Sequence, residues 1–511
     1  MIENLFTQIA QNQNTRAALS AIRAAIKNEQ DYLYAKKLSG DGSMLTALLT
    51  AEDAKTRKNA AALLGDLGIE AAAGALYQAY NQEKTLFVRP ALLQALKKTN
   101  AYPYLPKLKE QYDLLCAQEI KEDEKKHIRE ELRALEQILR QEGKEVRHTF
   151  TGWNRKYAIL LTTNPKYADV TKEQLSRSAQ RAGVNTLGVQ AVVDSLEEVV
   201  KIRTFRDLLF PIALGVKLTM EDGPEAFGEA VAESKLLPIL LRCHKEPDPF
   251  YFRIDLKGGI GLEERSRYTK RAAAVIEEKS GRRLLNAPEE YEFELRVLFD
   301  KNRRIHVFLR MATIPMERFS YRKEAIAASI HPSSAALFLA LAKPYLKKNA
   351  QILDPCCGVG TMLVERHMLL PVREVYAIDV FGEAVLKARI NAEAAGLRVN
   401  FIHKDYLDFK HGYLFDEIIC NMPMRGKRTK EEQDAFYQGF FDKSQELIAP
   451  DGILLLYSNE NGFIKKQLRL HPAFRLRKEF LISEKDQFYF YVIGTCVKSG
   501  EKKEKGNREG V

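Results

Sequence analysis

Hydrophobic residues in the first 147 positions recur every three or four residues, which is the spacing of amphipathic helices. Ala17–Ile26 and Thr46–Leu67 are rich in alanine and leucine, and residues 121–141 place apolar side chains on one stripe of a charged helix. Residues 57–64 align with residues 89–96 at an offset of 32 positions, the length of one helical-hairpin repeat. Residues 1–147 are therefore predicted to be all-α, either as a repeat array or as an irregular bundle.

Residues 148–318 show two hydrophobic periods: short runs that alternate apolar and polar residues, typical of strands, stand between runs with helical spacing. A helix is predicted over Tyr268–Glu278, and the turn residues 300–303 predict a hairpin between Phe293–Leu298 and Arg304–Met311. Further strands are predicted over Tyr157–Thr163, Leu236–Cys243 and Phe250–Leu256. We expect an α+β region.

Residues 319–497 alternate short apolar runs with helical ones, which predicts a parallel sheet covered by helices on both faces. The expected parallel strands are Ile352–Leu353, Glu374–Ile378, Asn400–His403, Glu417–Cys420 and Gly452–Tyr457. An antiparallel pair, Phe474–Leu481 and Phe488–Cys496, is expected to follow. The remaining polar tail, residues 498–511, is predicted to be disordered.

The composition narrows the class of protein. The 511 residues carry a formal net charge of +11, and such an excess favours polyanionic partners such as nucleic acid. The six cysteines form no CxxC pair and the histidines form no HExxH or HxH pattern, so no metal site is expected. The first residues lack a basic leader, and no apolar run approaches the roughly 20 residues of a membrane span. We therefore expect a cytoplasmic protein.

Residues 354–361, with the sequence DPCCGVGT, lie between a predicted strand and the predicted helix Thr361–Leu369. Glycine at two positions of this turn allows a tight bend and the close approach of a ligand, and the helix beyond it offers unpaired amide hydrogens. The candidate ligand-binding residues of the turn are Asp354, Pro355, Cys356, Gly358, Gly360 and Thr361.

Two further acids end the next predicted strands. Asp379 follows 25 residues after Asp354 and can accept both hydroxyls of a ribose, as acids do in dinucleotide folds. Asp405 ends the third strand, where its carboxylate can accept from an adenine amine. Three acids in register after successive strands predict a nucleoside pocket.

The fourth strand ends in Asn421-Met422-Pro423-Met424. This segment resembles the (N/D)-P-P-(Y/F) motif of amino-group methyltransferases, and together with DPCCGVGT it is similar to class I S-adenosylmethionine-dependent enzymes. Tyr321-Arg322-Lys323-Glu324 and the helix over residues 383–396 extend this resemblance to THUMP-containing RNA methyltransferases. The match is strong in the catalytic third and weaker upstream, and residues 1–147 resemble HEAT-type repeats.

The resemblance implies a Rossmann-like catalytic domain, an α+β THUMP-like middle region with a ferredoxin-like part, and S-adenosylmethionine as cofactor. Asn421 and the carbonyl of Met422 are then expected to hold an exocyclic amine, with Asn421 also at the cofactor. The sequence departs from the motif at Met422, at Met424, where an aromatic normally stacks on the base, and at the inserted Arg425. The favoured reaction is methylation of guanine N2 in tRNA or rRNA. The alternatives are adenine-N6 methylation and a degenerate scaffold that only binds cofactor and RNA.

Basic residues near the site and in the middle region are candidates for phosphate contacts, which position nucleic acid without reading its sequence. They are Lys427 and Arg428 beside the motif, and Lys257, Arg265, Arg267, Lys270 and Arg271 upstream. Structured RNA is the expected partner, and the N-terminal helices are a candidate surface for a protein partner.

Overall fold

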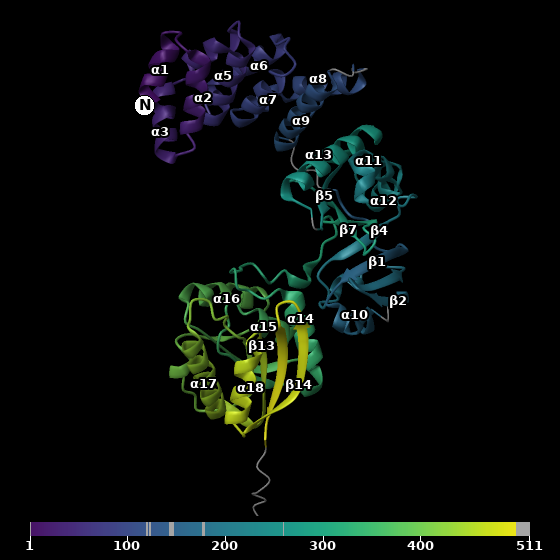
Figure 1. Cartoon of the computed structure of the whole chain (residues 1–511), viewed down its shortest axis with the longest axis vertical. Helices are drawn as coiled ribbons and strands as arrows, with labels where there is room; N and C mark the ends of the chain where they lie inside the picture. The colour runs from purple at the N-terminus through teal and green to yellow at the C-terminus, as the bar shows by residue number, and fades with distance from the viewer. Residues whose placement is uncertain are drawn as a thin grey trace, which may run out of the picture. The chain divides into compact units, whose positions relative to one another are not determined.

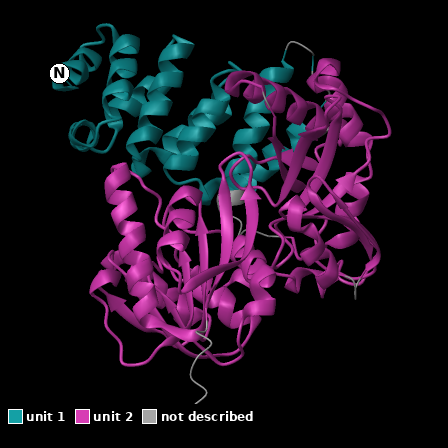
Figure 2. Cartoon of the chain, turned by 60° about the horizontal axis from the view of Figure 1, so that its bottom comes forward, with its two compact units in different colours: residues 1–147 teal, residues 148–511 magenta. Residues whose placement is uncertain are grey.

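The computed structural model describes residues 2–118, 121, 124–142, 148–175, 179–258 and 260–496. The chain divides into two compact units, residues 1–147 and residues 148–511 (Figure 2). The tail predicted to be disordered, residues 498–511, lies outside the described residues. No helix of the described ranges combines the length and the apolar character that crossing a membrane requires.

The first unit is built from helices alone in its described part (Figure 1). Its α-helices are α1 Ile2–Ala10, α2 Thr15–Ala25, α3 Glu29–Ser39, α4 Ser43–Ala47, α5 Ala54–Leu67, α6 Ala73–Gln82, α7 Arg89–Lys98, α8 Leu105–Ala117 and α9 Lys125–Glu142. Short 3₁₀ turns lie at Leu48–Thr50, Glu70–Ala72 and Tyr102–Tyr104. The predicted all-α character is confirmed.

The stretch Thr46–Leu67, whose spacing predicts helical structure, is interrupted, because the chain forms α4, a 3₁₀ turn and then α5. Asp53 causes the break, since its carboxylate accepts from the backbone N–H groups of Lys55 and Thr56 and so caps α5. A side-chain cap of this kind satisfies amides that a continuous helix would leave to its own carbonyls.

The two aligned segments lie in α5 and α7, although α5 begins three residues earlier in the alignment than α7 does. Arg57 and Arg89 occupy equivalent positions, and each forms an ion pair of 2.7 Å with a buried carboxylate, that of Glu83 and that of Glu131 respectively. The two helices pack closely, because a Cβ on Gly65 would lie 2.7 Å from the Cα of Ala95. The two aligned segments thus share a helix and an ion pair at the equivalent arginine, and the repeat array stays a prediction.

The middle region contains an eight-stranded sheet in the order β2-β3-β1-β4-β8-β7-β5-β6. Its strands are β1 Tyr157–Thr162, β2 Ala179–Asn185, β3 Gly188–Val193, β4 Leu208–Ile212, β5 Phe250–Leu256, β6 Leu284–Asn286, β7 Phe293–Phe299 and β8 Ile305–Met311. Its helices are α10 Ala168–Leu175, α11 Gly223–Glu233, α12 Leu236–Cys243 and α13 Leu262–Lys279. The predicted hairpin is confirmed as the antiparallel pair β7–β8.

The predicted strand over Leu236–Cys243 is wrong, because this segment is helix α12. Leu236, Leu240 and Cys243 are buried, so the burial follows helical spacing instead of alternation. Leucine favours helix over strand, and Pro238 falls in the first turn, where its missing N–H costs little. A short apolar run of this length does not by itself distinguish a strand from a helix.

The C-terminal region forms a seven-stranded sheet in the order β11-β10-β9-β12-β13-β15-β14. Its strands are β9 Ala350–Asp354, β10 Val372–Asp379, β11 Asn400–His403, β12 Phe415–Asn421, β13 Ile448–Ser458, β14 Phe474–Ser483 and β15 Phe488–Thr495. Its helices are α14 Pro332–Ala342, α15 Thr361–Leu369, α16 Gly382–Ala394, α17 Lys430–Leu447 and α18 Asn461–Leu470. The first five strands of the chain order are parallel, and β14 and β15 are antiparallel, as predicted.

Successive residues of the central strands enter opposite cores. Ile352 packs with residues of α14, α15 and α16, whereas Leu353 packs with residues of α17 and α18. Ile419 and Ile418 divide in the same way. Because side chains alternate across a strand, a sheet that is apolar on both faces must be covered on both. The predicted α/β architecture is confirmed.

Candidate active site

The candidate catalytic residues lie at one edge of the C-terminal sheet. Asp354 ends β9, Asp379 ends β10 and Asn421 ends β12. The strand order runs outward in both directions from the neighbours β9 and β12. Ligands of open α/β sheets bind at the carboxyl ends of the strands where the order reverses, so these three residues surround the expected ligand position.

The glycine-containing turn adopts a conformation that other residues rarely take. Gly358 has a φ of 52° and Gly360 a φ of 78°, both left-handed. The amide of Gly358 donates to Oδ2 of Asp379 at 2.8 Å, and the amide of Phe381 donates to Oδ1 of the same carboxylate at 3.0 Å. The turn and the second acid are therefore one hydrogen-bonded structure, and each oxygen of Asp379 retains capacity for a further donor.

Asp354 is buried at the centre of this structure, and its Oδ1 accepts from the amide of Cys356 at 3.1 Å. Burial raises the pKa of Asp354 to about 8, and the nearby charge of Asp379 acts in the same direction. Burial also raises the pKa of the thiols of Cys357 and Cys420. These cysteines are therefore neutral lining groups rather than nucleophiles.

The sequence prediction missed Asn391, which is fully buried on α16. Its Nδ2 donates to the carbonyls of Val359 and Glu324, both at 3.0 Å, and its Oδ1 accepts from the amide of Glu324 at 2.9 Å. One side chain thus fastens the glycine turn to the Tyr321–Glu324 segment. A polar residue on the buried face of a predicted helix was the signal that could have found it.

Glu365 connects the catalytic domain to the middle region. Its carboxylate is 1% exposed and pairs with Arg203 at 2.8 Å, while the hydroxyl of Tyr321 donates to it at 2.6 Å. Burial, followed by the charge of Glu365, raises the pKa of Tyr321, which stays protonated and acts as donor. Glu365, in the middle of α15, is therefore held by Arg203 of the middle region and by Tyr321.

Around Asp379 the structure exposes apolar side chains. Phe381 is 70% exposed and Val380 is 53% exposed. Asp405 lies in the adjacent turn, where its Oδ1 accepts from the amide of Leu407 at 2.9 Å and so caps a 3₁₀ helix, Tyr406–Asp408. Its Oδ2 has no protein donor among the described residues. The hydroxyl of Thr361 is buried and has no hydrogen-bond partner among the described residues.

The strand end at Asn421 departs from the expected motif for a visible reason. The amide of Met422 donates to the carbonyl of Tyr457 at 2.9 Å, a bond that a proline at this position could not make. The Met422 side chain is buried in the core beside α17. The carboxamide of Asn421 is half-buried and makes no hydrogen bond to any described residue, so it remains available to a ligand.

The rest of the motif faces outward. Met424 is 65% exposed, whereas the carbonyl of Pro423 accepts from Gln433 of α17 at 3.4 Å. Arg428 donates to the same glutamine at 3.2 Å and lies over the ring of Phe436. Arg428 therefore helps to fix the loop, and Lys427 beside it is exposed.

The basic residues predicted in the middle region lie on or before α13. Lys257 pairs with Asp255 at 3.0 Å and Arg271 with Glu225 at 2.5 Å. Arg265 donates to the carbonyl of Gly258 at 3.2 Å. Arg267 and Lys270 are exposed. The structure thus gives three of these five cations intramolecular partners.

Comparison with protein families identifies the C-terminal region. Residues 320–487 match the model of the RMKL-like methyltransferase domain. The tRNA (guanine(10)-N2)-dimethyltransferase of Methanothermobacter thermautotrophicus is 25% identical over 186 residues, which are 34% of this chain and 55% of that protein. The S-adenosyl-L-methionine-dependent Diels-Alderase iliD of Neonectria sp. is 34% identical over 95 residues, 19% of this chain and 37% of that protein. The match therefore spans about half, or less, of these relatives' lengths.

Two solved structures share the fold over about two thirds of the chain. TrmN from Thermus thermophilus has 21% identity and a TM-score of 0.50, covering 67% of this chain and 100% of its own. SMU.472, crystallised with SAH, has 16% identity and a TM-score of 0.51, covering 66% of this chain and 98% of its own. Residues 320–487 form a methyltransferase domain.

The cofactor of this domain is S-adenosylmethionine, and the described residues fit it. Asp379 offers two acceptor oxygens to a pair of hydroxyls, and Val380 and Phe381 offer exposed apolar surface to a flat ring. The unpartnered hydroxyl of Thr361 lies at the start of α15, where backbone amides also point outward. A nucleoside with a charged tail matches this set of donors, acceptors and apolar side chains.

Proposed function

We propose that the protein is an S-adenosylmethionine-dependent RNA methyltransferase that acts on an exocyclic base amine, namely guanine N2 of tRNA or rRNA. One observation supports this above others. The carboxamide of Asn421 is half-buried, unpartnered among the described residues and placed at the end of β12, next to the strand whose turn receives the cofactor. An amide in that place has the hydrogen-bonding capacity to hold an amine.

The proposed chemistry needs no general base. The lone pair of a base amine is delocalised into the ring, which makes the nitrogen a weak nucleophile. Oδ1 of Asn421 and the carbonyl of Met422 each accept one amine hydrogen and so direct the lone pair. The bound cofactor would supply the electrophilic methyl group: as the N–C bond forms, the S–C bond breaks and the sulfur leaves as a neutral thioether. The surplus proton of the methylated amine then passes to water. Positioning and electrostatics then provide most of the rate.

RNA is the proposed substrate because of the relative from Methanothermobacter thermautotrophicus and the middle region. That relative is named for guanine N2 in tRNA. In this chain residues 148–318 are proposed to be a THUMP-like and ferredoxin-like RNA-binding region, with Lys257, Arg265, Arg267, Lys270 and Arg271 near phosphates and Lys427 and Arg428 at the mouth of the site. Residues 1–147 are proposed to be a HEAT-like domain that contacts a protein partner, and residues 319–497 the catalytic domain.

A degenerate scaffold is the second candidate. The exposed Met424 favours it, because an extruded base normally stacks on an aromatic side chain at this place, and a thioether holds a ring less well. If the protein is an enzyme, adenine N6 is the alternative target, since Asn421 can accept a hydrogen bond from either exocyclic amine.

The test is an assay of methyl transfer with product identification. The full-length protein is incubated with isotopically labelled S-adenosylmethionine and unmodified tRNA and rRNA transcripts, which are then digested and analysed by mass spectrometry. We expect labelled N2-methylguanosine. Labelled N6-methyladenosine would support the adenine alternative. Cofactor and RNA binding without labelled product would support the scaffold.

A further inference from the structure

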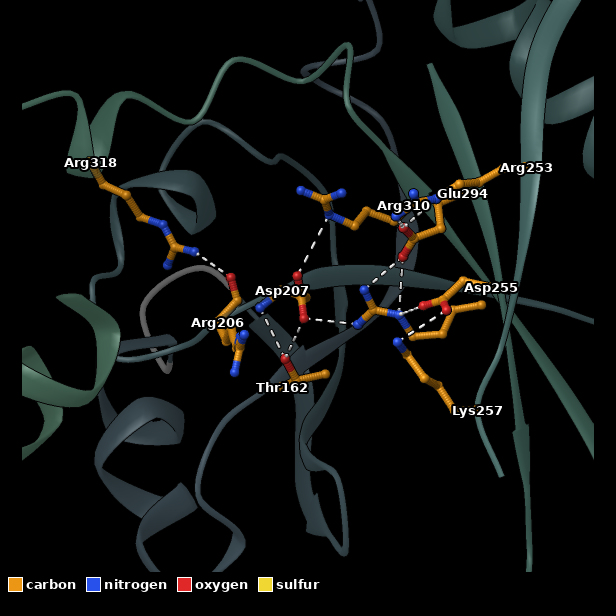
Figure 3. A network of polar contacts seen from close by, with 10 residues as sticks. Thr162, Arg206, Asp207, Arg253, Asp255, Lys257, Glu294, Arg310 and Arg318 are labelled. Atoms are coloured by element: carbon orange, nitrogen blue, oxygen red, sulfur yellow. Dashed lines mark hydrogen bonds and ion pairs between the residues drawn. The ribbon is translucent and has the colours of Figure 1, made fainter. Parts of the chain in front are cut away.

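Arg318 is a partly buried cation that has no carboxylate partner in the described ranges. Its guanidinium lies 3.6 Å from the ring centre of Phe205 and donates to the carbonyl of Ile202 at 2.6 Å. It also donates to the carbonyl of Arg206 at 2.9 Å (Figure 3). Burial, together with the charge of Arg203, lowers its pKa to about 10. Carbonyls and a ring orient this cation, and no carboxylate of the described residues forms an ion pair with it, although the charges of Asp207 and Glu365 act on it from farther away.

Two further arginines, Arg206 and Arg322, also form no ion pair within the described residues. The side chain of Arg206 is exposed and forms no ion pair with a described residue, and Arg322 has a buried Nε–H without an acceptor. The neighbouring acid, Asp207, is engaged elsewhere, by Arg296 at 2.8 Å and Arg310 at 3.6 Å (Figure 3). The local carboxylates therefore leave an excess of positive charge.

Phe319 connects two of these arginines with His331. Its ring centre lies 4.7 Å from the guanidinium of Arg318, and its carbonyl accepts from the amide of Arg322 at 3.0 Å. The ring of His331 contacts the Phe319 ring edge-on, with centres 6.2 Å apart, and caps α14 by accepting from the amide of Ser333 at 3.2 Å. Burial, followed by the charges of Arg206, Arg322 and Arg318, lowers the pKa of His331 to about 4. Arg206 precedes β4, whereas Arg318 and Arg322 belong to one short segment, and the charges of all three act on one ring at the positive end of a helix, opposed by the charge of Asp207.

This cluster lies on the route from the middle region to the active site. Arg318 precedes and Arg322 belongs to the segment that Asn391 fastens to the glycine turn through Glu324. Further along this segment, a terminal methyl of Ile326 lies 4.0 Å from where a Cβ of Gly358 would stand. The cluster and the glycine turn are therefore joined by one short, hydrogen-bonded segment of the chain.

We propose that Arg206, Arg318 and Arg322 form a binding site for a backbone phosphate of the RNA substrate. The guanidinium fork matches two phosphate oxygens and presents several donors at once. None of the large apolar side chains that are exposed in the described residues falls within 199–212 or 317–334, so the apolar centre of a protein interface is missing there. The site deepens the proposed function and rests on it.

The test uses the full-length protein and an in-vitro-transcribed tRNA. Arg206→Gln, Arg322→Gln and the double variant are compared with Arg398→Gln, whose exposed arginine lies just before β11, an edge strand of the catalytic sheet. Arg206 is a safe position to change, because only its backbone bonds to neighbouring residues in the described structure. Affinity is measured between 50 and 200 mM salt, and KM and kcat are measured with the same tRNA.

Each cluster variant is expected to bind tRNA about tenfold more weakly and to lower the slope of log affinity against log salt by about one for each phosphate that is no longer bound. KM for tRNA rises while kcat and the affinity for S-adenosylmethionine stay unchanged. A double variant that behaves like Arg398→Gln, in a protein that does methylate tRNA, would overturn the phosphate site and leave the function intact. A wild-type protein that neither binds nor methylates RNA would overturn both.

Discussion

The carboxamide of Asn391 holds the carbonyl of Val359 at 3.0 Å, inside the turn between the two left-handed glycines. The same nitrogen donates to the carbonyl of Glu324 at 3.0 Å. A residue on a helix thereby fixes both the turn proposed to receive the cofactor and the segment that enters the catalytic domain. Without the carboxamide of Asn391, these two buried carbonyls would lose a hydrogen-bond donor.

Replacing Asn391 with alanine should loosen the glycine turn. We expect the free energy of unfolding to fall by about 1–3 kcal/mol, since buried backbone groups lose their partner, and the affinity for S-adenosylmethionine to fall with it. Denaturation and calorimetry measure the two effects. Asn400→Ala, at an exposed position of β11, is the control, and an Asn391→Ala protein equal to that control in both would contradict the role.

Asp379→Ala should weaken the binding of S-adenosylmethionine by roughly 2–3 kcal/mol, because hydrogen bonds to a charged acceptor are worth about this much. The variant also removes the acceptor of the Gly358 amide. Titration calorimetry checks the affinity, with Asp408→Ala, in the neighbouring 3₁₀ turn, as a matched loss of one carboxylate. Unchanged affinity in Asp379→Ala would remove this residue from the cofactor site.

The stability of the ligand-free protein should fall as the pH rises. The pKa of Asp354 is about 8 in the folded chain against an ordinary value of 3.8, so between these values the folded state keeps a proton that the unfolded state releases. The resulting loss of folding stability is fully present above pH 8 and absent below pH 4. At 1.36 kcal/mol per pKa unit, this shift corresponds to a loss of stability of at most about 6 kcal/mol.

Asp354→Asn should remove most of this dependence, because the amide oxygen can still accept from Cys356 and carries no charge. We expect its Tm to exceed that of the wild type at pH 8 and to approach it at pH 4.5. Thermal unfolding across this range measures the difference, and Asp405→Asn serves as an exposed control. Parallel curves for Asp354→Asn and wild type would show that Asp354 is ionised in the folded state at neutral pH.

Asn421→Ala should separate cofactor binding from chemistry. We expect a nearly unchanged affinity for S-adenosylmethionine and a decrease of kcat by about a hundredfold or more, which is typical for loss of one preorganised polar partner. The measurement is single-turnover methyl transfer to the tRNA or rRNA transcript that the labelling assay identifies as the substrate. Wild-type-like turnover in Asn421→Ala would show that the amine is held by another group.

Met424→Tyr should keep or raise the rate of methyl transfer. A ring at this exposed position can stack on an extruded base, and base–aromatic stacking is worth about 1–3 kcal/mol per base. Met368→Tyr, another exposed methionine on the C-terminal half of α15, controls for a general effect of the new ring. A large decrease specific to Met424→Tyr would place this side chain away from the base.

The sequence alone determined the parallel strands, the glycine turn and the strand-end residues Asp354, Asp379 and Asn421. These features are local, because apolar runs and turn chemistry fix where a strand stops, and parallel topology then brings the carboxyl ends to one edge. The same local reasoning failed at Leu236–Cys243, since an apolar run of eight residues fits a strand and a helix equally well until its neighbours decide which face is buried.

Only the tertiary structure decided which polar groups meet across the chain. Asn391 bonds to Glu324, which is 67 positions away, and Arg203 pairs with Glu365, which is 162 positions away. Neither spacing follows any period, because such contacts depend on how whole elements pack. The raised pKa of Asp354 and the unneutralised charge of Arg318 have the same origin, since burial and the distance to the next charge are properties of the folded chain and not of any segment of it.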